Sequence, residues 1–283
     1  MPHQLAAART RPAKLGVIGN ISRDLAVYPG GRTTGLLGGA ALHVSLAAAR
    51  AGLPAAPATV IGTDLAWIIS DPRLAGLDLT AVTILPGTSP AFRLVYDDDG
   101  CVAGTGTSFG VAETTLTGHA LSLLSSHGSW RWHVCCRRPL DAPSILSCLA
   151  AAGTPFSVDF HLASAAAIMP PTAAILGHAA AIFVNAAEFA ILSRSADPGS
   201  LPLVVVSDGP RAASVLRHGK ISVRAVPPPV TAAEVTGAGD VLAGTFLAEA
   251  ARGASDEDAL RAAVSAASEA VAGPGLVISQ AGS

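Results

Sequence analysis

Short apolar runs alternate with amphipathic segments of helical period along most of this sequence. The runs predict strands, because strands buried on both faces of a parallel sheet read as nearly continuous apolar stretches. The segments between them repeat their apolar positions at three and four residues, which predicts helices. Strands are expected at 15–18, 58–61, 80–85, 130–136, 155–160, 181–184 and 202–207, and helices at 40–51, 117–126, 141–152, 172–178, 186–193 and 256–271.

This alternation indicates an α/β fold, in which a largely parallel sheet is covered by helices on both faces. Ligands of such a sheet bind outside the carboxyl ends of its strands. Residues 91–96 and 101–105 flank Asp97–Gly100 without an intervening helix and predict a β-hairpin outside the main sheet; residues 212–217 and 220–226 predict another hairpin. We expect a single domain over residues 15–283, preceded by a disordered tail at residues 1–14.

The segment Thr236–Asp240, with the sequence TGAGD, lies between a β-leaning stretch and an apolar helical pattern that closes at Arg252 and Gly253. Free N–H groups and the helix dipole favour an anion at such a helix start, and small residues let a phosphate approach the backbone. Asp240 could there take a proton from a hydroxyl while the N–H groups hold the charge of a transferred phosphoryl group. The alternative is that Asp240 only complements the helix dipole.

Two further polar features lie where the acceptor of such a reaction would bind. Asp24 follows the first predicted strand, near the expected ligand crevice. Gly38 and Gly39 open the predicted helix at 40–51, where paired glycines allow a ligand to touch the backbone. A plain tight turn would explain the two glycines too.

Polar residues also follow the strands at 181–184 and 202–207. Asn185 and Glu188 offer hard oxygen ligands that could hold Mg²⁺ through water, or they form an N-cap with its first-turn acid. Ser207 and Gly209 could form a backbone turn near a nucleotide.

Composition narrows the function classes. The chain has 283 residues, a net charge of −2 and a pI near 6.4, without the basic surplus of a nucleic-acid binder. Its four cysteines show no paired spacing, which predicts reduced thiols and a cytoplasmic location. The longest uncharged stretch, Leu162–Ala187, is split by Pro170 and Pro171 and is not expected to cross a membrane.

This ordered set of motifs resembles the ribokinase-like family of sugar and nucleoside kinases, from Leu15 to about Gly275. EVTGAGD resembles the family's DTTGAGD signature, LLGGAALHVSLAAARAG its GG signature, and NAAE and SDG its N-x-x-E and nucleotide-turn motifs. The resemblance implies a lid formed by the 91–105 hairpin, through which homodimers could pair. It implies that Asp240 is the catalytic base and that Gly237, Ala238 and Gly239 form the anion hole. It also implies that the sugar is contacted by Asp24, Gly38, Gly39 and His43. ATP would be contacted by Thr236, Asn185, Ser207 and Gly209, and Mg²⁺ would be held by Glu188.

The departures from the family pattern concern the acceptor and a monovalent cation. His43 stands where the family has Asn, and Arg137 falls near an acidic sugar contact. A charged His43 together with Arg137 would favour an acceptor that bears a phosphate or carboxylate. The alternative is a packed His43 and a solvent-exposed Arg137. Glu234 and Val235 alter the segment near which family members bind a monovalent cation, which leaves K⁺ activation open.

The predicted reaction is transfer of the ATP γ-phosphoryl group, with Mg²⁺, to a primary hydroxyl of a sugar or sugar-containing small molecule. The sequence has no GxxxxGK[ST] motif, so it is not expected to be a P-loop kinase. A nucleoside kinase and a catalytically weak relative that binds sugar or nucleotide stay open as alternatives. A dinucleotide-dependent oxidoreductase is a further one, although GVIGNIS lacks the spacing of GxGxxG.

Overall fold

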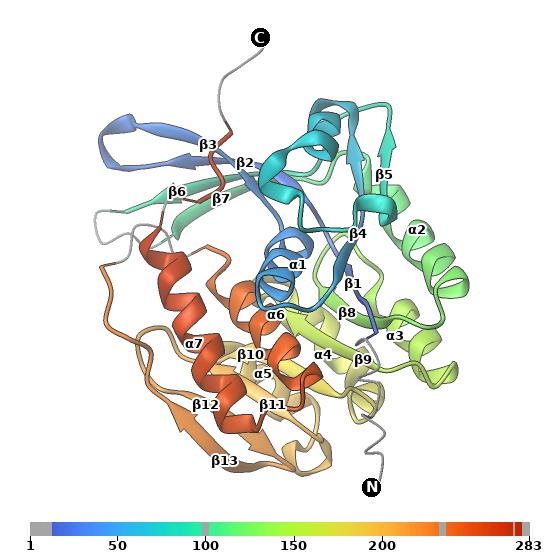
Figure 1. Ribbon diagram of the computed structural model, residues 1–283, viewed down its shortest axis with the longest axis vertical. Helices are drawn as coiled ribbons and strands as arrows, with labels where there is room; N and C mark the ends of the chain where they lie inside the picture. Colours follow the sequence, from blue (N-terminus) through green and yellow to red (C-terminus); the bar gives the residue numbers. More distant parts are fainter. Residues whose placement is uncertain (1–12, 98–101, 232–235, 274, 279–283) are drawn as a thin grey trace, which may run out of the picture.

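The computed structural model describes residues 13–97, 102–231, 236–273 and 275–278 (Figure 1). Of the predicted tail at residues 1–14, residues 1–12 therefore lie outside the described residues. Lys14 is described, and it forms an ion pair with Asp78. Glu234, Val235 and the start of the second predicted lid strand, Cys101, also lie outside the described residues.

Within the described residues, a nine-stranded sheet forms the centre of the molecule, in the order β13-β12-β11-β10-β9-β8-β1-β4-β5. All strands of this sheet except β12 and β13 run parallel to one another, which confirms the predicted sheet. β12 and β13 add an antiparallel hairpin. After β1, the chain places β4 and then β5 on one side of that strand. It then returns to place β8 on the other side of β1, followed by β9, β10 and β11. The direction in which strands are added therefore reverses between β1 and β8. The strands are β1 (Leu15–Ile18), β4 (Ala55–Gly62), β5 (Val82–Leu85), β8 (Arg131–Cys136), β9 (Phe156–Phe160), β10 (Ala181–Asn185), β11 (Val204–Ser207), β12 (Ala213–Arg217) and β13 (Lys220–Ala225).

Helices cover both faces of this sheet, because its strands are apolar on both sides (Figure 1). Alternate strand residues point to opposite faces, so Val17 and Cys135 pack under α1 and α6 while Ile18 and Val134 pack under α2 to α5. The helices are α1 (Ala40–Arg50), α2 (Ala112–Ser126), α3 (Ala142–Ala151), α4 (Leu162–Leu176), α5 (Ala186–Ser195), α6 (Ala238–Ala251) and α7 (Asp256–Ala272), with short 3₁₀ turns at Pro29–Gly31, Thr63–Ser70, Pro72–Leu74, Leu79–Ala81 and Pro198–Ser200.

A second sheet lies to one side of the main sheet, in the order β3-β2-β6-β7 (Figure 1). β6 (Ala91–Tyr96) and β7 (Val102–Ser108) pair in antiparallel register, as expected of the 91–105 hairpin. β2 (Ser22–Val27) and β3 (Thr33–Gly38) were not expected, although β2 alternates buried and exposed residues as a half-buried strand does. The sheet is therefore larger than the predicted hairpin, and its action as a lid stays a prediction.

α4 shows the largest difference from the predicted helices. It begins at Leu162 instead of residue 172 and continues through Pro170 and Pro171. Proline lacks an N–H and normally breaks a helix. Here Ile168, Met169 and other apolar residues of α4 are buried in the core between α3 and α5, so tertiary packing outweighs the local cost. Among the described residues, no helix is both long and apolar enough to span a bilayer.

Candidate active site

The predicted sugar-binding residues meet where the second sheet joins α1. Asp24 lies on the buried face of β2, opposite Leu36 of β3. Its carboxylate lies directly against Gly38, because a Cβ at that position would overlap Oδ2 of Asp24. Gly39 follows as the N-cap of α1. Glycine at position 38 is therefore what allows the Asp24 carboxylate to approach the start of α1.

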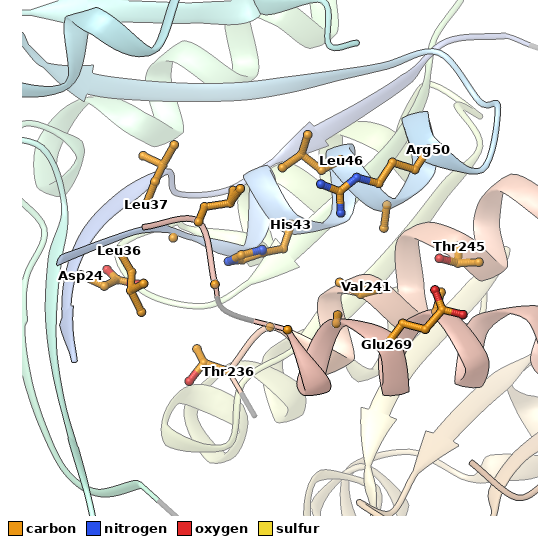
Figure 2. Close-up of a pocket in the computed structure, with 18 of the residues that line it drawn as sticks. Asp24, Leu36, Leu37, His43, Leu46, Arg50, Thr236, Val241, Thr245 and Glu269 are labelled. Atoms are coloured by element: carbon orange, nitrogen blue, oxygen red, sulfur yellow. The ribbon is translucent and has the colours of Figure 1, made fainter. Parts of the chain in front are cut away.

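A pocket of about 490 Å³ opens at these residues and runs between α1, α6 and α7 (Figure 2). Asp24 and Leu36 lie at one end, His43 of α1 lies in the middle, and Arg50 and Glu269 lie at the other end (Figure 2). Thr236 and Gly237, which lead into α6, also line it. The pocket thus connects the sugar-side residues with the start of α6.

The start of α6 is where the sequence predicts an anion site. Gly237 is the N-cap and has φ 84°, a left-handed conformation that suits glycine. Asp240 lies in the first turn, and a Cβ at Gly239 would meet no atom within 4 Å. The first N–H groups of a helix have no partner within the helix, so this open turn offers donors to an anion.

His43 packs its imidazole against Gly237, since a Cβ on that glycine would lie 3.2 Å from Cδ2 of His43. Burial lowers the pKa of His43; Asp240 opposes this effect, whereas Arg137 and Arg50 add to it. The lowered pKa favours a neutral imidazole over the charged His43 of the hypothesis. A neutral imidazole offers one donor and one acceptor nitrogen to a hydroxyl-bearing ligand.

Arg137, which follows β8, links the sheet to α6. Its Nη2 donates to Oδ1 of Asp240 at 3.2 Å and to Oδ2 of Asp159 on β9. Burial alone would lower the pKa of Arg137, but the carboxylates of Asp159 and Asp240 outweigh it and raise that pKa. Arg137 is thus not solvent-exposed, and its charge is balanced before any acceptor binds. The lowered pKa of His43 and the pairing of Arg137 with two carboxylates both disfavour the predicted anionic acceptor.

The second sheet also contacts the residue that precedes the start of α6. The hydroxyl of Tyr96 on β6 lies 2.8 Å from Oγ1 of Thr236, a hydrogen bond between residues far apart in the sequence. The Tyr96 ring stacks on Tyr28 with a centroid distance of 5.2 Å and an interplanar angle of 11°. Tyr96 therefore joins the second sheet to the residue that precedes the Gly237 turn.

Three of the predicted nucleotide contacts and Glu188 lie at the carboxyl ends of β10 and β11, whereas the remaining predicted contact, Thr236, lines the pocket instead. Asn185 and Ser207 are register partners in these strands, and Gly209 follows with φ 57°. Asn185 Oδ1 accepts from the Glu188 N–H, and Glu188 Oε2 accepts from the Asn185 N–H, both at 2.9 Å. The two residues form a capping box, which confirms the alternative that they are an N-cap with its first-turn acid. None of these four residues lines the pocket in Figure 2.

Glu188 nevertheless differs from an ordinary capping residue. Its side chain is buried, and burial raises its pKa to about 7; the N–H of Asn185 opposes this shift, and the nearby Asp159 adds to it. A buried carboxylate beside another carboxylate favours a bound cation. Together with the open turn at Gly239, this donor set fits Mg²⁺ and the phosphates of a nucleotide.

Sequence reasoning assigned Arg137 to an anionic acceptor instead of to Asp240, and it missed Asp159. The available signal was a charged residue inside the apolar run FSVDF, because charged residues are rarely buried without a partner. His161, the N-cap of α4, also lies near this site. Burial lowers its pKa, Arg137 adds to that effect, and Asp240 and Asp159 oppose it.

Parts of this chain are similar in sequence to known kinases. Residues 144–281 match the family model described as pfkB family carbohydrate kinase. The cytidine kinase of Thermococcus kodakarensis is 39% identical over 88 residues, which cover 31% of this chain. The matched part spans 32% of the length of that curated relative.

Solved structures extend the similarity to the whole fold. A nucleoside kinase from Burkholderia thailandensis, in complex with inosine, superposes with a TM-score of 0.78 at 20% identity, over 93% of this chain and 92% of that one. An E. coli protein in complex with ATP and Mg²⁺ superposes with a TM-score of 0.74 at 19% identity, over 93% and 94% of the two chains. At these identities the likeness establishes the fold.

Proposed function

We propose that this chain, whose residues 144–281 belong to the pfkB family of carbohydrate kinases, is an ATP-dependent kinase acting on a primary hydroxyl of a sugar or nucleoside. One observation carries the proposal. The pocket that Asp24 and His43 line is also lined by Gly237, the N-cap of the helix whose first turn contains Asp240. A hydroxyl bound on the sugar side would therefore approach a carboxylate and an anion-binding helix end at once.

Asp240 acts as the general base. Its Oδ1 is held by Arg137, so the proton of the acceptor hydroxyl is taken by Oδ2. The transfer proceeds through a loose transition state, in which positioning and charge stabilisation supply most of the catalysis.

The backbone N–H groups of Ala238, Gly239 and Asp240 receive the charge that develops on the transferred group. ATP, when bound, supplies the phosphoryl group, and Mg²⁺ offsets the charge of its phosphates. Asn185, Ser207, Gly209 and Thr236 would contact the nucleotide, and Glu188 would hold the metal from the carboxyl end of β10. K⁺ activation stays open, because Glu234 and Val235 lie outside the described residues.

The acceptor is held by Asp24 and His43 over the backbone of Gly38 and Gly39. The relatives that act on or bind nucleosides favour a nucleoside as the second candidate acceptor. The stacked rings of Tyr28 and Tyr96 support this choice, since they pack in one cluster with Leu36, which lines the pocket. Such rings provide an apolar surface beside the sugar-binding residues.

The protein is further proposed to be cytoplasmic and to pair as a homodimer through the second sheet. Leu25 on the outer side of β2 is exposed, as a residue at such an interface would be in the single chain. Sedimentation of the purified protein checks this point, and a monomer at micromolar concentration would contradict it.

Kinase activity is tested by ADP release from Mg·ATP over a panel of pentoses, hexoses and nucleosides. We expect acceptor-dependent ADP formation and a phosphomonoester product. A melting-temperature rise with ATP but no turnover on any acceptor would instead identify a binding relative. A rise with NAD(P) and none with ATP would favour the oxidoreductase.

A further inference from the structure

A chain of buried polar residues runs beneath α1 and α6, where apolar side chains would be expected. His133 and Cys135 on β8 are register partners of Ser157 and Asp159 on β9. His133, Ser157 and Asp159 are all buried, and Nδ1 of His133 lies 2.9 Å from Oγ of Ser157. Its Nε2 lies 3.5 Å from Oδ1 of Asp159.

His133, Cys135 and Asp159 are close enough to suggest a metal site, since their ligand atoms lie within 4.8 Å of one another. Two observations argue against it. Burial raises the pKa of the Cys135 thiol well above its usual value, which opposes the proton loss that metal binding requires. The guanidinium of Arg137 already pairs with Asp159. A metal ion here would have to displace that guanidinium or lie beside it as a second cation.

Asp159 is instead the buried anchor of a hydrogen-bonded link that runs through Arg137 to Asp240. Burial alone would raise the pKa of Asp159, but Arg137 and His133 outweigh it and keep that pKa below its ordinary value. Asp159 is therefore ionised and holds Arg137 from within the sheet. Both contacts of Arg137 use Nη2, which carries two N–H groups, one for each carboxylate.

We propose that Arg137 is a positioning residue for the catalytic base: anchored by Asp159, it fixes the Asp240 carboxylate so that Oδ2 faces the acceptor hydroxyl. This inference rests on the proposed kinase function. The side chain of an aspartate in a first helical turn can rotate, and a hydrogen bond to one oxygen restricts that rotation. A small displacement of a reacting group strongly lowers the rate of the chemical step, so we expect loss of this hydrogen bond to lower kcat.

The competing explanation is that Arg137 only neutralises the buried Asp159. Both explanations predict that Arg137→Met alone is damaging, because it leaves an unpaired buried charge. They differ for the double variant Arg137→Met/Asp159→Leu, in which both buried charges are replaced by apolar side chains of similar size. Such replacements are often tolerated by the fold.

The experiment measures kcat, acceptor KM and melting temperature for wild type, for Arg137→Met, for the double variant and for Arg138→Met. Arg138 is the matched control, because it is the next residue, is 69% exposed in its side chain and pairs with Glu113 on the surface. We expect the double variant to melt near wild type and to lose roughly 10²-fold in kcat with little change in KM. Arg138→Met should match wild type in all three quantities.

A double variant that recovers both melting temperature and kcat would overturn the proposal in favour of charge neutralisation.

The failure of the kinase proposal would be visible separately. If wild type phosphorylates no acceptor, the Arg137–Asp240 contact is tested by the melting temperatures of Arg137→Met and Asp240→Ala, alone and combined, in the Asp159→Leu background. Additive changes in melting temperature would mean that the two side chains do not interact and would overturn the proposal; a non-additive change would support the contact.

Discussion

The raised pKa of Glu188 predicts a specific dependence of stability on pH. The ordinary value of 4.5 rises to about 7 because the side chain is buried beside Asp159. At roughly 1.4 kcal/mol for each pH unit, this rise corresponds to about 3 kcal/mol. Between pH 4.5 and about 7 the folded state binds more protons at this residue than the unfolded state, so its contribution to the free energy of unfolding falls as pH rises.

The substitution Glu188→Gln isolates this effect, since Gln keeps an oxygen for the Asn185 N–H but does not titrate. Urea unfolding of both proteins without metal should give similar free energies near pH 4.5. Near pH 8 the Gln variant should be the more stable by about 3 kcal/mol. Other titrating groups are common to the two proteins and cancel in the difference. A difference that stays constant from pH 4.5 to pH 8 would refute the reasoning.

Mg·ATP tests the metal role of the same residue. A cation held by Glu188 favours the ionised carboxylate, so Mg·ATP at pH 8 should stabilise wild type more than the Gln variant. The gap between the two proteins should therefore shrink when Mg·ATP is added. An unchanged gap would leave Glu188 with its capping role alone.

Three further predictions concern the residues around α6. Gly239→Val should fold like wild type, since a Cβ there meets no atom within 4 Å, and should lose turnover; equal losses of turnover and melting temperature would contradict the anion hole. The acceptor KM of wild type and of His43→Asn should be flat from pH 6.5 to pH 8.5, because the lowered pKa favours a neutral imidazole; weaker binding above pH 6.5 in wild type alone would restore a charged His43. Tyr96→Phe should cost about 1 kcal/mol in unfolding free energy and lower kcat, since it removes the bond to Thr236; an unchanged kcat would separate the second sheet from catalysis.

The parallel sheet could be predicted from the sequence because its strands are buried on both faces. The run of β1 and the first four residues of β10 are apolar throughout, and the helices of the chain have a clear period. β2 and β3 were missed because half-buried strands carry polar residues at alternate positions, and Ser22–Val27 leads into the turn at Pro29–Gly31. Their place beside β6 depends on long-range pairing that a local pattern does not reveal.

The candidate site divides in the same way. Asp240, Gly237 and Gly38 lie in short motifs whose local geometry follows from residue type, such as the left-handed Gly237 before α6. The link from Asp159 through Arg137 to Asp240 depends on the register of β8 against β9 and on where α6 begins. No spacing in the sequence indicates that three such distant residues meet.

The role of Asp240 as general base is tested most directly by turnover of Asp240→Asn on the true acceptor at saturating Mg·ATP. Asn preserves the shape of the side chain and an oxygen for Arg137, so the melting temperature and the affinity for Mg·ATP should match wild type. We expect kcat to fall by roughly 10²–10⁴-fold, the usual contribution of a general base. A variant that keeps most of its turnover would contradict the account.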